Sequence, residues 1–349
     1  MTRLPTVDDV GRAAGVSRQT VSNVLNAPDL VRPETRSRVE AAIAELGYRP
    51  HASARRLRMR ASSTIGIRLD PVADGISGAV LDRFLHALTA QADARGLRVM
   101  LYTASDPADE VRQVRRLRDG ADVDAFVLTS TFYDDPRTRW LVDNGVPFVT
   151  FGRPWGEDDV DAAPHPWVDV DGYAGVRAAT EHLLATGARR IAHLGWPSHS
   201  GTGDDRRRGW RDALAAAAVV ETPDLSIIAE DAVEAARAAV DLTLRTGGGF
   251  DGIVCASDSL ALGALLALGP PAPDARPTPV IGFDDTPVAA ALGLSSVEQP
   301  LELVAAGALE LLFGPSGATL VERPAPGTVG PDAASAPLHR LVTPRLVIR

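Results

Sequence analysis

Four polar side chains near the start of the chain have the chemistry and the spacing needed to read DNA bases. They fall on one face of a helix predicted after residue 17, and they are Arg18, Gln19, Ser22 and Asn23. The other face of that helix carries Val21, Val24 and Leu25, which are expected to pack inward. Arg18 lies in the first turn, where recognition helices reach base edges in the major groove. These residues therefore predict contact with double-stranded DNA.

Two more short helices are predicted around this one. Thr6 is placed to cap the first helix, Gly15 ends it, and Ser17 caps the second. A third helix is predicted from about Pro33 to Leu46, closed by Gly47. Such a unit could simply pack as a three-helix bundle, but the polar face of the second helix favours a helix-turn-helix DNA-binding domain.

Charge is distributed unevenly along the chain. Residues 1–60 contain eleven Arg and six acidic residues, a balance of +5, whereas the whole chain carries −9. All 36 basic residues are Arg, so the clustering at the N-terminus is more informative than the number. Only this first segment has the charge expected of a polyanion binder.

Strand-like and helix-like segments alternate through the rest of the chain. Apolar runs begin at Ile65, Val99, Ala125, Phe148, Val168, Ile191, Ile227, Ile253 and Val280. Helical patterns such as 80–94, 176–184 and 260–268 separate most of them, which predicts parallel sheets covered by helices. The strands are too many for one comfortable sheet, so two Rossmann-like lobes are expected.

Polar residues follow several of these predicted strands, where ligands of doubly wound sheets bind. The candidates for binding a small effector are Asp70, Thr129, Arg153, Ser257, Asp258 and Asp284. Each single carboxylate could instead cap a helix or form a turn. Together they suit a polyol, because carboxylates accept hydrogen bonds from hydroxyls and Arg donates to them. Five aromatic residues in or beside these loops could stack on sugar rings or belong to the core: Phe132, Tyr133, Trp155, Trp167 and Trp196.

Composition gives little support to enzymatic, metal-binding or membrane functions. The chain has 349 residues, 45% of them hydrophobic, and no apolar run long enough to span a bilayer. We find no dinucleotide or phosphate-loop fingerprint, no nucleophile elbow and no metal-like spacing of the seven His, so no catalytic residue, metal or cofactor is expected. The single Cys255 and the absence of an apolar leader predict a cytoplasmic protein.

The N-terminal segment resembles the LacI (lactose repressor) family of bacterial transcription regulators. The resemblance rests on the first two predicted helices, between Thr6 and Asn26, and on three later motifs, Thr35-Arg36, Leu46-Gly47-Tyr48-Arg49-Pro50 and Ala54-Arg55-Arg56-Leu57. It implies further effector contacts at Arg206 and Gln299. It also implies a hinge whose Leu57 wedges into the minor groove. The further expected DNA contacts are Thr6, Ser17, Thr20, Asn26, Arg32, Thr35, Tyr48, Arg55, Arg56 and Leu57.

The same resemblance implies an architecture and a mode of action. The expected fold is an all-α helix-turn-helix headpiece (1–49), a hinge helix and linker (50–63), and an α/β core (64–349) like a periplasmic binding protein. Its first lobe is expected at about 64–163 and 293–325, and its second at about 164–292 and 326–349. A transport receptor shares this core, but the headpiece argues against one. We expect a homodimer on a pseudo-palindromic operator that represses sugar or glycoside genes until a small sugar binds. The alternative is a regulator corepressed by a purine or another metabolite.

Overall fold

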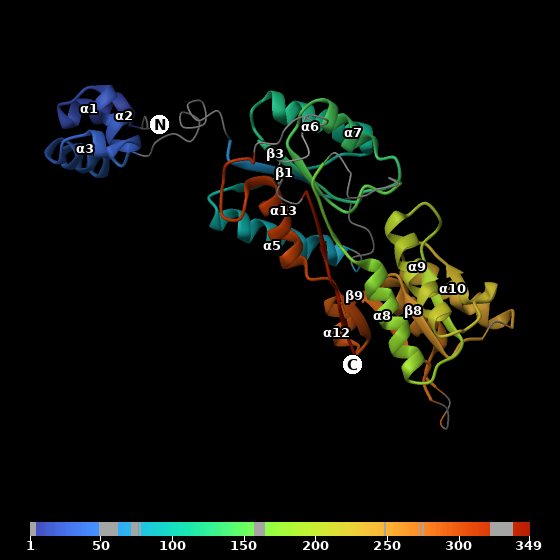
Figure 1. Cartoon of the computed structure of the whole chain (residues 1–349). Helices are drawn as coiled ribbons and strands as arrows, with labels where there is room; N and C mark the ends of the chain where they lie inside the picture. The colour runs from blue at the N-terminus through green and yellow to red at the C-terminus, as the bar shows by residue number, and fades with distance from the viewer. Residues whose placement is uncertain are drawn as a thin grey trace. The chain divides into compact units, whose positions relative to one another are not determined.

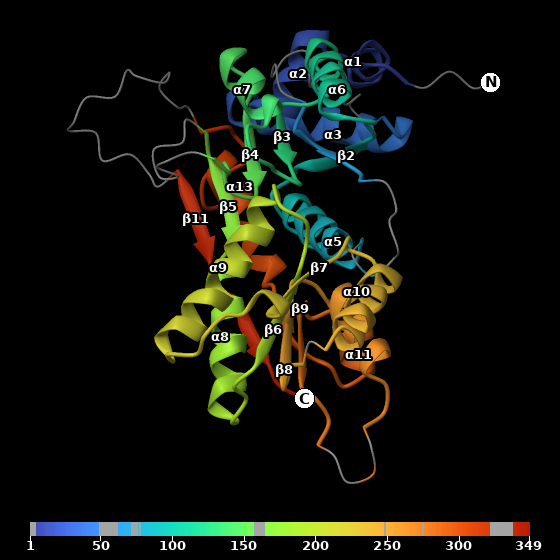
Figure 2. The same cartoon turned by 90° about the vertical axis from the view of Figure 1, so that its right-hand side faces the viewer.

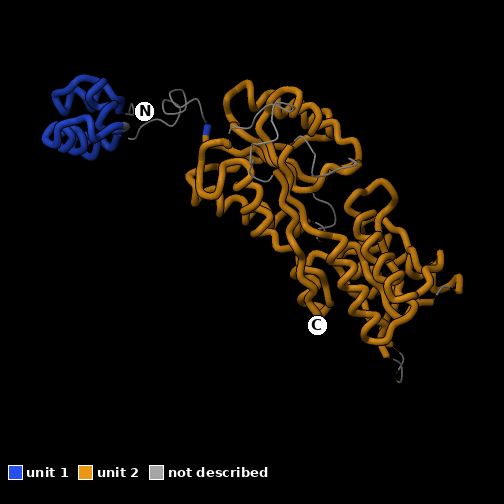
Figure 3. The backbone as a smooth tube through the Cα atoms, viewed as in Figure 1, with its two compact units in different colours: residues 1–62 blue, residues 63–349 orange. Residues whose placement is uncertain are grey.

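The structure is a computed structural model that describes residues 5–48, 62–70, 76, 78–156, 165–247, 249–271, 273, 276–321 and 338–349, without the side chain of Asn26. The chain forms two compact units, residues 1–62 and residues 63–349 (Figure 3). The predicted hinge contacts Arg55, Arg56 and Leu57 lie outside the described residues.

The first unit contains the three helices predicted from the sequence: α1 (Val7–Ala14), α2 (Arg18–Asn26) and α3 (Pro33–Leu46), with a 3-10 turn η1 (Pro28–Leu30) between the last two. The Thr6 hydroxyl accepts from the Asp9 amide while the Asp9 side chain accepts from the Thr6 amide, which satisfies two donors at the start of α1. Gly15 ends α1 and Gly47 ends α3 in the left-handed conformation. Val10, Val21 and Val39, one from each helix, are fully buried and form the centre of this small core.

The second unit begins with a sheet of six described strands, all parallel (Figure 1). They are β1 (Thr64–Arg68), β2 (Arg98–Tyr102), β3 (Ala125–Leu128), β4 (Phe148–Phe151), β5 (Trp167–Val170) and β11 (His339–Val342), in the order β11-β5-β4-β3-β1-β2. Helices α5 (Gly78–Ala94) and α13 (Leu301–Phe313) pack together against one face, and α6 (Pro107–Asp119) and α7 (Pro136–Asp143) cover the other. We call this the first lobe.

The second lobe repeats the same order of strands. Its sheet runs β12-β10-β9-β8-β6-β7, and β12 is the one antiparallel member among the described strands. The strands are β6 (Ile191–Gly195), β7 (Ser226–Ile228), β8 (Gly252–Cys255), β9 (Val280–Asp284), β10 (Ser295–Glu298) and β12 (Arg345–Val347). Figure 2 shows α8 (Gly172–Ala185) and α9 (Gly201–Ala216) on one side of this sheet, and α10 (Val233–Arg245) and α11 (Asp258–Leu268) on the other. Two short helical segments complete the lobe, η3 (Pro223–Leu225) and α12 (Pro287–Ala291). The predicted fold class is confirmed.

The chain passes between the lobes at different residues from those expected. Strand β5 at 167–170 and strand β11 at 339–342 belong to the first sheet, whereas β10 at 295–298 belongs to the second. The expected second-lobe ranges 164–292 and 326–349 therefore include two first-lobe strands, and the expected first-lobe range 293–325 includes a second-lobe strand. The C-terminal segment forms two strands, one in each sheet, because Pro344 interrupts it. A strand's own composition does not reveal which of two similar sheets it joins.

Candidate functional site

The order of the strands in both sheets locates the candidate ligand site. In each lobe the order in which successive strands are added to the sheet reverses between two central parallel neighbours, β1 and β3 in the first sheet and β6 and β8 in the second. Doubly wound sheets bind ligands beyond the carboxyl ends of the strands at this switch point. Here lies a cavity of about 240 Å³ to which both lobes contribute, and we call it the central cavity.

Four of the eight predicted effector residues line the central cavity: Asp70, Thr129, Arg206 and Gln299. Asp70 follows β1 and Thr129 follows β3, so they flank the switch point of the first lobe. Arg206 comes from the first half of α9, and Gln299 lies where the chain returns from the second lobe to the first. The structure thus brings together residues separated by more than two hundred positions in the sequence.

Arg206 is held rigidly at the wall of the central cavity. Its guanidinium lies 3.6 Å from the ring centroid of Phe283, and one of its terminal nitrogens donates to the carbonyl oxygen of Ala256. Its Nε–H is buried and makes no hydrogen bond within the described structure. Only 5% of the residue is exposed, and burial lowers the pKa of its guanidinium. A ligand oxygen that accepted from this group would relieve the cost of leaving a buried donor unpaired.

The other four predicted residues do not line the central cavity. Ser257 caps α11 and donates to Asp231, and Asp284 accepts from Gln299 Nε2 at 2.6 Å behind the cavity wall. Asp258 accepts from the amide and hydroxyl of Thr286 at 2.7 and 2.8 Å and from the Ser296 hydroxyl at 2.6 Å. Asp258 therefore fastens neighbouring segments of the second lobe together, which is the structural role that a carboxylate after a strand often has.

Arg153 connects the two lobes at the edge of the central cavity. Its Nε lies 2.9 Å from Asp169 in the first lobe, and its terminal nitrogen lies 2.5 Å from Asp205 on α9. Nearby, the Tyr133 hydroxyl donates to Asp204 at 3.3 Å. A side chain at Gly201 would overlap the ring of Trp155. These contacts help to hold the two lobes together.

Sequence reasoning missed several lining residues. They are Val80, Leu81, Ser130, Thr131, Phe151, Gly152, Asp169, Val170 and Thr202. Asp169 had a detectable signal, because it is a charged residue within the otherwise apolar strand Trp167–Val170, and its side chain is buried. Thr202 had none, since nothing in its local sequence distinguishes it from an ordinary residue in the first turn of a helix.

None of the five proposed aromatic residues lines the central cavity. Trp167 is buried and stacks on His339, Trp196 packs beside Arg206, and Phe132 lies beside Arg137. Tyr133 and Trp155 line a larger groove of about 740 Å³ next to Arg153. Phe151 is the one aromatic side chain among the described residues that line the central cavity.

In the first unit, the predicted base-reading residues lie where DNA could reach them. Ser17, Arg18 and Gln19 are exposed in the first turn of α2, and Gln19 donates to Asn23 at 3.0 Å. Arg32 is also exposed, while Thr20, Ser22, Asn23 and Thr35 are half-buried. Tyr48 is only 6% exposed and belongs to the core of the unit, so at most its hydroxyl edge is available to a phosphate. The Thr6 hydroxyl is already hydrogen-bonded to Asp9.

The described residues contain neither a membrane-spanning helix nor a metal-binding cluster. No described helix has the length and apolar character needed to cross a membrane. Within the same residues, no group of three or more His, Cys, Asp or Glu is arranged to hold a metal ion.

Both units match known protein families. Residues 6–51 match the family described as bacterial regulatory proteins, lacI family. Residues 81–272 match the family described as periplasmic binding proteins and sugar binding domain of LacI family. The two matches fall in the two compact units and keep their order along the chain.

Individual relatives agree with these matches. The HTH-type transcriptional regulator CelR of Thermobifida fusca is 34% identical over 86% of this chain and 89% of its own. A solved structure described as the transcriptional regulator CelR-cellobiose complex is 30% identical, covers 99% of both chains and has a TM-score of 0.69. The lac repressor dimer bound to operator and the anti-inducer ONPF shares the fold, with a TM-score of 0.77 at 24% identity over 99% of this chain and 98% of its own.

The Asp284 carboxyl gives a testable pH dependence of stability. Burial raises its pKa to about 8, although Arg206 opposes the rise, so the folded protein retains a proton that the unfolded chain releases near pH 4. Between about pH 4 and about pH 8 the ionisation of Asp284 therefore makes the folded state less stable as the pH rises. We expect the unfolding free energy of wild type minus that of Asp284→Asn to fall across this range in denaturant titrations. The exposed Asp119→Asn is the control, and a constant difference for Asp284→Asn would contradict the assignment.

Proposed function

The chain belongs to the LacI family of bacterial transcription regulators, and from this premise we propose that it represses genes for sugar or glycoside use. We propose further that a neutral sugar in the central cavity releases the protein from a pseudo-palindromic operator. The ligand would act by binding one arrangement of the two lobes better than the other, because only a difference in affinity can shift such an equilibrium.

The charge balance of the central cavity is the observation that carries the sugar assignment. Asp70 lies 2.5 Å from Arg68, and Asp169 lies 2.9 Å from Arg153, so both carboxylates already have a cationic partner. A charged ligand would disturb this balance in a partly buried site. Hydroxyl groups would not, since they can donate to the carboxylates and accept from Arg206 and Gln299.

Two further observations favour a sugar over a purine. A purine would need aromatic rings on both of its faces, and Phe151 alone does not provide them. The CelR structure that this chain resembles is described as a complex with cellobiose. Tyr133 and Trp155 line the larger neighbouring groove, and we propose that this groove holds a second sugar unit, so that the ligand is a glycoside or small oligosaccharide.

The first unit supports a division of DNA contacts between bases and phosphates. Arg18 and Gln19 are exposed at the start of α2, with Ser22 and Asn23 one turn later, so we propose that these four face base edges. Thr6, Ser17, Thr20, Asn26, Arg32, Thr35 and Tyr48 are proposed as contacts that position the unit on the phosphates. The hinge contacts Arg55, Arg56 and Leu57 stay a prediction from the sequence.

We propose that the second unit forms a homodimer through the side that carries the edge strands β2 and β7. Exposed apolar residues occur on both strands and on the adjoining helices: Leu101, Ile228, Leu242 and Leu266. Figure 2 shows α5, α10 and α11 on this same side. Edge strands and apolar side chains at one surface suit a self-complementary twofold interface, which would also match an operator made of two half-sites.

A ligand panel tests the effector class. Glucose, cellobiose, lactose and adenine would be compared by the thermal stability of the full chain and by release of operator DNA. We expect cellobiose or a related glycoside to stabilise the protein, by about 2.7 kcal/mol at a hundredfold excess over its dissociation constant. Asp70→Asn should weaken that effect while Asp119→Asn leaves it intact. Stabilisation by adenine alone would make the corepressor alternative correct.

Substitution of Arg18 tests base readout. A bidentate contact to a base contributes about 1–3 kcal/mol of discrimination, so Arg18→Ala should reduce operator affinity more than affinity for a scrambled duplex at matched salt. Arg38→Ala removes the same charge from the exposed surface of α3 and should weaken both duplexes equally. If Arg18→Ala also weakens both duplexes equally, Arg18 contacts only phosphates.

The proposed dimer surface is tested by adding charges to it. We expect wild type to sediment at twice the mass of one chain, and Leu101→Glu combined with Leu242→Glu to sediment as a monomer, because buried unpaired carboxylates oppose association. Leu292→Glu changes an equally exposed leucine next to α12 and should leave the dimer intact. A dimer that survives the double substitution would rule out this surface.

A further inference from the structure

One loop of the first lobe serves both the central cavity and the contact between the lobes. It joins β3 to α7 and comprises residues 129–135. Its first three residues line the cavity, and Tyr133 donates to Asp204 across the lobes. Ser130 and Asp134 adopt the left-handed conformation, at φ 56° and φ 55°. Non-glycine residues rarely adopt it, so surrounding contacts must impose this shape on the loop.

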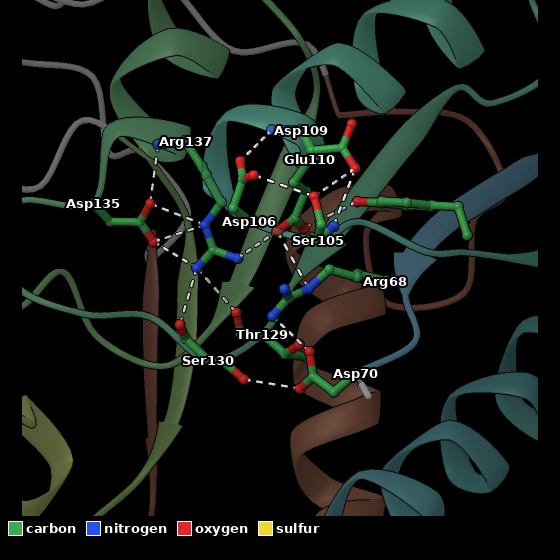
Figure 4. Close-up of polar contacts among 11 residues, drawn as sticks. Arg68, Asp70, Ser105, Asp106, Asp109, Glu110, Thr129, Ser130, Asp135 and Arg137 are labelled. Carbon is green, nitrogen blue, oxygen red and sulfur yellow. Dashed lines mark hydrogen bonds and ion pairs between the residues drawn. The ribbon is translucent and has the colours of Figure 1, made fainter. Parts of the chain in front are cut away.

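Arg137, in the first turn of α7, provides those contacts. It is only 1% exposed, and one of its terminal nitrogens donates to the carbonyl oxygens of Thr129 at 3.1 Å and Ser130 at 3.0 Å (Figure 4). The same guanidinium donates to Asp135 at 2.6 Å. A single planar group therefore holds the start and the end of the loop.

The charge of Arg137 is balanced by a closed ring of contacts that includes two cavity residues. Arg137 pairs with Glu110 at 2.7 Å, Glu110 pairs with Arg68 at 3.3 Å, and Arg68 pairs with Asp70 at 2.5 Å. Asp70 then accepts from the Ser130 hydroxyl at 3.0 Å, which completes the ring (Figure 4). Arg137 does not line the central cavity itself. It reaches the cavity in two ways, directly through Ser130 and indirectly through Glu110, Arg68 and Asp70.

We propose that Arg137 is the positioning residue that fixes the Ser130–Asp70 pair in the central cavity, and that this fixed pair selects among sugars that differ in the configuration of one hydroxyl. The selective role rests on the proposed function, whereas the hold on the loop does not. The Ser130 hydroxyl already donates its one hydrogen to Asp70, so a sugar can meet both groups only by donating a hydroxyl hydrogen to each of them. Both donations are possible only where the two acceptor oxygens stand at a set separation and angle. If the loop could move, that requirement would be lost, and the sugar with the opposite configuration at this hydroxyl would also bind.

Arg137→Lys tests the proposal without removing the buried positive charge. Lys retains a partner for Glu110 or Asp135 but lacks the planar set of donors that reaches two carbonyls and two carboxylates together. Tyr102→Phe is the matched control. It removes one hydrogen bond to Glu110, at 3.2 Å, within the same buried network and without touching the loop. Both variants would be made in the full chain.

The first measurement is hydrogen exchange, which needs no ligand. Arg137→Lys should speed exchange of amides in residues 129–135 by at least about tenfold, with the other strands of the first lobe unchanged. Tyr102→Phe should leave that loop as in wild type. Unchanged loop exchange in Arg137→Lys would overturn the proposal, whether or not any sugar binds.

The second measurement separates the selective role from a structural one. Cellobiose and lactose differ in the configuration of one hydroxyl. We expect Arg137→Lys to reduce the affinity for the preferred disaccharide by at least about tenfold and the affinity for the other disaccharide by less. The ratio of the two affinities should therefore approach one. Equal losses for both sugars, with operator affinity also reduced, would show a merely structural residue. If wild type binds neither disaccharide, the proposed selection between them is wrong, and the exchange result alone decides whether Arg137 holds the loop.

Discussion

The central cavity depends on one constraint. Buried charge at the carboxyl ends of the parallel strands must be neutralised. Unpaired ions are costly to bury, and the two carboxylates at the cavity wall each have an arginine partner supplied by the protein itself. Asp70 has Arg68, and Asp169 has Arg153. Because these partners come from β1 and from beyond the end of β4, the geometry of the first sheet sets the positions of the groups that face a ligand. The cavity is therefore polar, but it suits an uncharged ligand.

The same constraint explains how the lobes could separate at little cost. Arg153 bridges Asp169 in the first lobe and Asp205 in the second. If the lobes parted, Arg153 would retain Asp169, while Asp205 would retain Arg208 and the Tyr173 amide. Neither side would be left with an unpaired buried ion. A ligand that binds one arrangement of the lobes better, as we propose, could then shift the balance between closed and open forms.

Local signals in the sequence predicted the secondary structure well and the pairing of elements less well. Caps such as Thr6 and Ser17 act over three residues, so the helices they begin could be read directly from the sequence. Strand β5 was detected from its apolar run, and β10 directly precedes the predicted site residue Gln299. Their assignment to a sheet depends on contacts between distant segments, which similar apolar patterns do not encode. Asp258 shows the same limit for the site, because its role was decided by Thr286 and Ser296, far along the chain.

The three segments that connect the lobes run close together. The Asp171 amide donates to the Val342 carbonyl oxygen at 2.9 Å, and a side chain at Gly175 would meet both Val297 and Pro344. Three adjacent tethers suppress twisting and sliding and leave one soft degree of freedom, a rotation about the line through the tethers. Displacement then grows with distance from that axis. A small change of angle at the cavity therefore becomes a larger movement at the far end of each lobe, and the linker to the DNA-binding unit joins the first lobe at the start of β1, the opposite end of that strand from Asp70.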